Sequence, residues 1–301
     1  MENLWERLRP LLPTGGQDGS AESRAARTFL WRECGLSGTP EAAAFRETVC
    51  ALIRYFTAPD DLARSEDRGR FLRSVAAVGE KAPAFSWRLL CSLAESEARA
   101  ADGGEERAWK AREAARAAEE TGCLDGPYPF PDAYSARAWF AGRSGEPDRR
   151  VPDDSWGVVT LLSGLPGTGK DRWIRENEPD KPMISLDGIR LETGIPPTQP
   201  QEKVLAIARE RAVSLLQAKQ PFVWNATNLT PEIRSGRIGL FEQYGARVRI
   251  VWLETGWNTR ACRNMGRTRD AVVPEEKVLD MLKAMEPPMP GEAWKVDWIF
   301  V

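Results

Sequence analysis

Histidine is absent from the 301 residues of this sequence. Its absence excludes Ser-His-Asp and Cys-His nucleophile systems, a histidine general base and any zinc site built on imidazole. Any chemistry that the chain performs must therefore use carboxylates, lysine, arginine, hydroxyls, thiols or backbone groups.

Long apolar runs and paired cysteines are also missing. No stretch approaches the ~18 apolar residues that a membrane span needs, and the N-terminal segment carries charges instead of an apolar signal core. The five cysteines are odd in number and never spaced as C-x-x-C, which is typical of reduced thiols. These absences predict a cytoplasmic protein without a membrane partner.

A strong charge of either sign is lacking as well. The 42 Lys and Arg residues nearly balance the 44 Asp and Glu residues, which leaves a net charge of −2. Contact with nucleic acid would therefore have to come from a local patch and not from the overall field. The hydrophobic fraction of 42% is enough for a core, and the length allows one large or two ordinary domains.

The first part of the chain, residues 1–125, is predicted to be an all-helical domain. In one segment the apolar residues recur at the steps typical of an amphipathic helix, namely Ala44, Val49, Leu52, Ile53 and Phe56. The predicted helical segments are 24–34, 41–56, 68–79, 86–100 and 105–120.

The pattern changes twice after the helical part. Residues 126–155 are rich in Pro, Gly and Asp, which indicates a connector with one short helix near Ala136–Phe140. In residues 156–301, apolar runs alternate with longer helical segments, so we expect an α/β domain with a parallel five-stranded sheet covered by helices on both faces. The predicted strands are 157–163, 183–187, 221–227, 247–254 and 296–300.

A glycine-rich segment follows the first predicted strand and precedes a helix. It has the G-x-x-x-x-G-K pattern of a phosphate loop in its required strand-to-helix context. Glycines let successive N–H groups point at a phosphate, the helix N-terminus adds partial positive charge, and Lys170 can bridge the β- and γ-phosphates of ATP. The predicted nucleotide-binding residues here are Gly164, Leu165, Pro166, Gly167, Thr168, Gly169, Lys170 and Asp171.

The last position of this loop departs from the usual pattern. A phosphate loop has Ser or Thr there, whose hydroxyl binds Mg²⁺, whereas this chain has Asp171. We hypothesise that Asp171 is a metal ligand for the Mg²⁺ of Mg·ATP, since a carboxylate suits that hard cation. The alternative is a helix-terminal residue that complements the helix dipole.

Polar residues follow the second predicted strand. Asp187 can accept the proton of an attacking hydroxyl, and Arg190 can hold an acceptor phosphate. This D-x-x-R pair, together with the phosphate loop, resembles the P-loop polynucleotide 5′-kinases, where it supplies the general base and the arginine that grips the substrate phosphate. The alternative is a surface Asp–Arg pair that caps a turn.

The third strand and the basic segment near the C-terminus extend the resemblance. The family tends to have an aspartate before T-N-L, whereas here Ala226 precedes Thr227, and the missing carboxylate could be linked to the one gained at Asp171. Asn225 and Asn228 could bind phosphate or cap strand ends.

Four arginines cluster at Arg260, Arg263, Arg267 and Arg269, and R-N-x-x-R resembles the kinase lid. The resemblance implies that Arg267 stabilises the transferring group, with Arg263 or Arg269 as helpers. The alternative is a solvated basic helix face.

The helical half resembles, more weakly, the HD-type phosphohydrolase domain that bacterial end-healing enzymes join to such a kinase. Segments 46–59 and 93–99 look like helices of that domain. Phe56 and Glu97 stand where a metal-binding histidine and an aspartate would be, so this half is interpreted as a degenerate remnant without metal ligands that serves as a scaffold or docking surface.

Together these features predict an ATP-dependent kinase, requiring Mg²⁺, of 5′-hydroxyl ends of nucleic acid, RNA more than DNA, in end healing. Its catalytic residues are predicted to be Lys170, Asp187, Arg190 and Arg267, and expected companions are an RNA ligase or a 3′-end-processing protein. Two alternatives stay open: a small-molecule or nucleoside kinase, and a catalytically weak nucleotide-binding scaffold. A polynucleotide groove would need stacking aromatics, for which Trp173, Trp224 and Trp257 are candidates.

Overall fold

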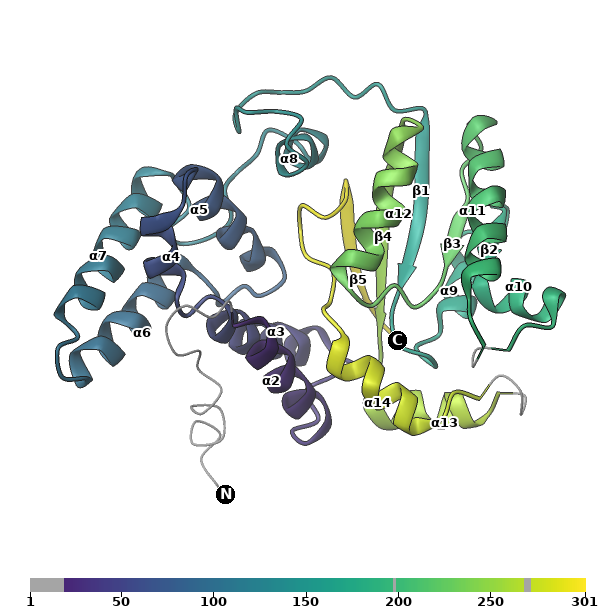
Figure 1. Cartoon of the computed structure of the whole chain (residues 1–301), viewed down its shortest axis with the longest axis horizontal. Helices are drawn as coiled ribbons and strands as arrows, with labels where there is room; N and C mark the ends of the chain where they lie inside the picture. The colour runs from purple at the N-terminus through teal and green to yellow at the C-terminus, as the bar shows by residue number, and fades with distance from the viewer. Residues whose placement is uncertain (1–18, 197–198, 268–271) are drawn as a thin grey trace. The chain divides into compact units, whose positions relative to one another are not determined.

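A computed structural model describes residues 19–196, 199–267 and 272–301 (Figure 1). The chain divides into two compact units, unit 1 from Met1 to Phe130 and unit 2 from Pro131 to Val301. None of the helices within these described ranges has the length and apolar composition needed to cross a bilayer.

Unit 1 is built from helices. Thr39, Asp67 and Ser86 each begin a helix by accepting a hydrogen bond from a backbone N–H of the first turn, which is the usual N-cap chemistry. The predicted segments correspond to α2, α3, α5, α6 and α7, and segment 68–79 also covers most of the 3-10 helix η2, whereas α4 was not predicted. The bounds are α2 (Ser20–Arg32), α3 (Pro40–Arg54), α4 (Ala58–Arg64), α5 (Arg68–Ala76), η2 (Ala77–Glu80), α6 (Trp87–Ala100) and α7 (Glu105–Glu120).

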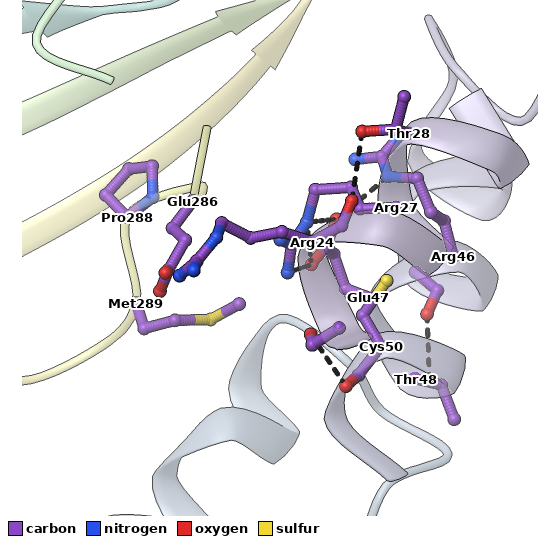
Figure 2. A network of polar contacts seen from close by, with 12 residues as sticks. Arg24, Arg27, Thr28, Arg46, Glu47, Thr48, Cys50, Glu286, Pro288 and Met289 are labelled. Atoms are coloured by element: carbon purple, nitrogen blue, oxygen red, sulfur yellow. Dashed lines mark hydrogen bonds and ion pairs between the residues drawn. The ribbon is translucent and has the colours of Figure 1, made fainter. Parts of the chain in front are cut away.

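A buried ion network joins α2 to α3 (Figure 2). Glu47 accepts hydrogen bonds from Arg27 Nη2 at 2.8 Å and from Arg46 Nε at 2.8 Å, and all three side chains are buried. Burial opposes ionisation of Glu47, but the two guanidinium groups outweigh it and lower the pKa of this carboxyl. The buried face of α3 therefore contains two charged residues, while the predicted stripe residues Val49 and Leu52 are only partly buried.

Unit 2 contains a five-stranded parallel sheet with strand order β2-β3-β1-β4-β5. The predicted α/β fold, of P-loop kinase type and preceded by a helical region, is confirmed. The strands are β1 (Gly157–Ser163), β2 (Met183–Ser185), β3 (Val223–Asn225), β4 (Ala246–Glu254) and β5 (Lys295–Phe300). The helices are α8 (Ala133–Phe140), α9 (Lys170–Asn177), α10 (Leu186–Thr193), α11 (Glu202–Gln217), α12 (Pro231–Gln243), α13 (Trp257–Met265) and α14 (Glu275–Ala284).

Both faces of the sheet are covered, and alternate strand residues belong to different cores. Leu161 and Trp224 pack with α11 and α12 in one core. Their neighbours Leu162 and Val223 pack in the other core, which includes Trp173 of α9. This alternation follows from the strand period of two and explains why the strands read as continuous apolar runs.

Helix α8 confirms the short helix predicted within the connector, near Ala136–Phe140. Arg137 of this helix donates from Nε to Glu242 of α12 at 2.7 Å and from Nη1 to the carbonyl of Gly291 at 2.9 Å. Its side chain is 15% exposed, so the helix is tied to unit 2 by a largely buried ion pair.

The parallel strands all end at the same edge of the sheet. Helices α9 and α10 begin directly after the loop and strand that leave this edge, and β4 leads into α13. In Figure 1, β1 points toward the end of the sheet where α10, α13 and α14 lie. Ligands of open α/β sheets bind beyond the carboxyl ends of the strands, so the candidate site is expected there.

Candidate functional site

The loop between β1 and α9 has a backbone that only glycine can adopt. Gly164, Gly167 and Gly169 have φ values of 146°, 86° and 91°. A Cβ atom on Gly164 would lie 2.5 Å from the Leu253 carbonyl oxygen, and one on Gly167 would lie 2.6 Å from that of Arg260. The glycines therefore allow both the curl of the loop and its close contact with neighbouring backbone.

The same loop is fastened to the end of β3. Asn228 donates from Nδ2 to the Leu162 carbonyl at 2.6 Å, and Ser163 Oγ donates to the Asn228 carbonyl at 2.8 Å. The Gly164 N–H donates to the Thr227 carbonyl at 2.9 Å. Asn228 is thus a buried strand-end cap that fixes the start of the phosphate loop, which favours the structural alternative for this residue.

Lys170 is the first residue of α9 and turns back over the loop. Its Nζ donates to the carbonyl oxygens of Gly164 and Leu165, both at 2.9 Å. Burial lowers the pKa of its ammonium group to about 8, Asp171 and Asp187 act in the opposite direction, and Arg267 adds to the lowering. The structure therefore brings the charges of these four residues within electrostatic reach of one another.

Asp171 meets a residue of the third strand. Asn225, the last residue of β3, donates from Nδ2 to Asp171 Oδ1 at 2.6 Å. Asn225 is buried, whereas Asp171 is exposed at the start of α9. Ala226, where the polynucleotide 5′-kinases tend to have an aspartate, packs against the hydrophobic core. The residue at the end of β3 that contacts Asp171 is therefore Asn225.

Asp187 lies between two arginines. Arg190 donates from Nη1 to Asp187 Oδ1 at 2.6 Å, and Arg267 from Nη2 to Oδ2 at 3.4 Å. Asp187 is at the start of α10 with its side chain 65% exposed, and Arg267 is two residues beyond the end of α13. Residues from two distant segments thus meet on one accessible carboxylate.

Gln201 is a neighbour of this group that the sequence did not reveal. Its Oε1 accepts a hydrogen bond from Arg190 Nε at 2.7 Å. Its Nε2 donates to the carbonyl oxygens of Pro196 and Gln199, at 3.0 Å and 2.6 Å. No motif marks a glutamine before a helix, and only the folded loop between α10 and α11 places it on Arg190.

The basic segment divides into structural and accessible residues. Arg260 is buried and pairs through Nη2 with Glu275 at 2.7 Å, while Asn264 donates to the Val273 carbonyl at 2.7 Å. These contacts join α13 to the start of α14. Arg263 is exposed, with Nη1 3.6 Å from the position of a Cβ on Gly169, so it lies beside the phosphate loop. Arg269 lies outside the described residues.

Two of the three candidate stacking residues are not accessible. Trp173 is only 7% exposed and Trp224 only 1%, and both belong to the hydrophobic cores. Trp257 is partly buried, with the Arg260 guanidinium 4.1 Å from its ring centroid. The expectation of base stacking on Trp173 or Trp224 is therefore wrong, because both rings fill the sheet–helix interfaces.

Comparison with known families agrees with this geometry. Residues 159–288 match a family model described as an AAA domain. These residues lie within unit 2, whose parallel sheet and helices have a P-loop kinase type of fold. A comparison with curated proteins found no match to the chain. The fold, the loop and the family match together support nucleotide binding and a phosphotransferase type of activity.

Few of the described side chains near the phosphate loop could bind a metal ion. Within residues 19–196, 199–267 and 272–301, no three Cys, Asp or Glu side chains are grouped so as to hold a metal ion. Mg²⁺ does not need such a cage, since it is usually bound by one or two carboxylates together with water and substrate phosphates. The exposed Asp171 carboxylate beside the phosphate loop fits that requirement.

Proposed function

We propose that this protein transfers the γ-phosphate of ATP to the 5′-hydroxyl end of a nucleic acid, RNA in preference to DNA. The observation that carries the proposal is the position of Asp187, an accessible carboxylate at the carboxyl edge of the sheet between Arg190 and Arg267. This position is near enough to Lys170 for the two charges to interact. The proposed base therefore contacts the proposed acceptor-side cation Arg190 and the arginine proposed for the transferring group, Arg267, and lies within electrostatic reach of Lys170.

The donor side would be held by the phosphate loop. Its N–H groups and Lys170 bind the β- and γ-phosphates, and Arg263 lies beside Gly169 where a further phosphate contact is possible. Lys170 would exchange its bonds to Gly164 and Leu165 for bonds to phosphate. Mg²⁺, with Asp171 as its protein ligand, would offset negative charge on the β- and γ-phosphates.

The transfer step follows from the acceptor side. Asp187 takes the proton of the 5′-hydroxyl, whose oxygen forms a bond to the γ-phosphorus as the bond from that phosphorus to the β–γ bridging oxygen breaks. ADP is the leaving group. Arg190 holds the neighbouring phosphate of the acceptor, and Arg267 stabilises the charge of the migrating group.

Unit 1 would not take part in this reaction. Its resemblance to a degenerate HD domain stays a prediction, and with it a scaffolding or docking role. The expected partners remain an RNA ligase or a 3′-end-processing protein.

The test is transfer of label from γ-labelled ATP to three acceptors: an RNA oligomer with a 5′-hydroxyl, the same sequence as DNA, and a free nucleoside. We expect labelled RNA with the wild-type protein and none with Asp187→Ala. Asp180→Ala, which removes an exposed carboxylate from a turn, is the matched control. Transfer to the nucleoside alone would favour a small-molecule kinase, and transfer that survives Asp187→Ala would refute the mechanism.

A further inference from the structure

The contact between Asp171 and Asn225 joins the departure in the phosphate loop to the end of β3, one residue before the second departure at Ala226. Asp171 follows Lys170 on the loop side, and Asn225 ends the strand next to β1. Their side chains are 54 residues apart in sequence and are joined by a 2.6 Å hydrogen bond.

In P-loop NTPases Mg²⁺ is held by a loop hydroxyl together with an aspartate that follows a strand. Here the loop position has the carboxylate, and the strand position that faces it has a neutral amide. Both arrangements therefore have one carboxylate, but here it belongs to the loop residue Asp171 and not to the strand residue. We infer that the Mg²⁺-binding carboxylate of this site has moved from β3 to Asp171, and that Asn225 is the residue that orients it.

The chemistry of the pair explains why an amide suits the strand position. An aspartate there would place a second carboxylate within hydrogen-bond distance of Asp171, and two like charges so close cannot both stay ionised without a metal. The Asn225 amide instead donates to Oδ1 and limits the rotation of the carboxylate. Oδ2 has no hydrogen bond to the described residues, so one oxygen is oriented while the other can reach a metal.

The burial of Asn225 supports this orienting role. It is 6% exposed, it lies in register with Ser185 of β2, and its Nδ2 is 3.7 Å from the sulfur of Met183. A buried amide with a fixed direction makes a better orienting group than an exposed one, because no water competes for its hydrogen bond. Hydrogen-bond partners of metal-binding carboxylates have this role in general.

A competing explanation is that Asp171 only complements the dipole of α9. That role stabilises the helix slightly and has no dependence on metal. The two explanations therefore differ in one measurable quantity, the factor by which Mg²⁺ changes nucleotide affinity.

The experiment measures the dissociation constant of ADP by calorimetry on the full chain, with Mg²⁺ and with a chelator. We expect Mg²⁺ to tighten ADP binding to the wild type and to have no such effect on Asp171→Asn. In Asn225→Ala the tightening should be reduced about tenfold, the lower end of the usual effect of removing a ligand's hydrogen-bond partner. The double variant Asp171→Ser/Asn225→Asp should recover the tightening, because it restores the ordinary arrangement.

Glu176→Gln is the matched control, since it removes an exposed carboxylate from the same helix α9. Among the described residues this carboxylate forms an exposed ion pair with Arg172. A second readout is the electron paramagnetic resonance signal of Mn²⁺ bound with ADP, which should broaden in the wild type and stay that of Mn·ADP in Asp171→Asn. If Asn225→Ala fails to fold, the exposed Asp171→Asn and the double variant carry the test. Equal Mg²⁺ dependence in the wild type and Asp171→Asn would overturn the inference.

The inference rests on the nucleotide-binding part of the proposed function and not on the acceptor. Because the assay contains ADP and metal only, a protein that phosphorylates no RNA end could still show the Mg²⁺ dependence. Conversely, RNA phosphorylation together with a metal-independent Asp171 would reject this inference alone.

Discussion

Arg190 donates a 2.6 Å hydrogen bond from Nη1 to Oδ1 of Asp187. The arginine assigned to the acceptor phosphate is therefore hydrogen-bonded to the proposed base. An acceptor phosphate that recruits Arg190 would at the same time release one oxygen of Asp187 for the hydroxyl proton. Binding of the acceptor and exposure of the base are thus coupled through one guanidinium group.

Gln201→Ala should weaken binding of the acceptor, because Arg190 loses the 2.7 Å contact of its Nε and with it a fixed direction. A hydrogen bond to a charged group contributes about 1.5–3 kcal/mol, so we expect KM for the 5′-hydroxyl end to rise about tenfold or more. KM for ATP should change little. Gln201→Glu keeps an oxygen for Arg190 and should restore most of the acceptor affinity, so equal effects of both changes would argue against a positioning role.

Arg267→Ala should lower kcat, with a smaller effect on either KM, because its guanidinium is proposed to act on charge that develops during transfer. Arginines in this role contribute about a thousandfold or more. Steady-state kinetics with RNA and ATP measure the change. Arg175→Ala, an exposed arginine of α9, provides the comparison. An unchanged turnover number would remove Arg267 from the catalytic group.

Lys170 should make nucleotide affinity depend on pH above neutrality. Its pKa of about 8 means that the ligand-free protein loses the ammonium proton as the pH rises through 8. A bound polyphosphate favours the charged form, so binding above pH 8 takes up a proton and affinity falls with rising pH, by up to about tenfold per pH unit. Calorimetry in buffers of different ionisation enthalpy measures this proton uptake. Lys170→Arg stays charged and should bind without it.

Glu47→Gln should destabilise unit 1, because it leaves Arg27 and Arg46 buried without their shared counter-ion. Breaking a buried ion pair in this way costs about 3–5 kcal/mol of unfolding free energy. Because the pKa of Glu47 is lowered in the folded protein, ionised Glu47 adds to the unfolding free energy at neutral pH, and this stabilisation is lost as the pH falls through the lowered pKa. Urea unfolding as a function of pH measures both, and Glu120→Gln, in an exposed pair with Arg116, should leave stability unchanged.

Helix α3 shows where sequence patterns mislead. Of the predicted apolar stripe, Ile53 is buried, but Val49 and Leu52 are only partly buried. Arg46 and Glu47, which the pattern did not predict to be buried, are more deeply buried than any of these. A charged side chain such as Glu47 can be buried only when an oppositely charged group is paired with it. That group is Arg27, which lies on α2, 20 residues away in the sequence. The spacing of residues within α3 cannot indicate an ion-pair partner that lies on α2. Helix α4 was missed for a related reason, since seven residues give too short a period to recognise.

The sequence by itself determined the phosphate loop, the alternation of strands and helices, and the D-x-x-R pair after β2. These are local features: glycine conformations, strand and helix periods, and residues a few positions apart that one turn places together. Only the tertiary structure decided that Asn225 and not Ala226 faces Asp171, that Gln201 holds Arg190, and that Trp224 is core. The placements of Asn225 and Trp224 depend on which strands are neighbours and which way their side chains alternate, because the sheet order β2-β3-β1 brings the ends of β1 and β3 together. The contact of Gln201 with Arg190 depends on how the segment between α10 and α11 packs, which no local pattern specifies.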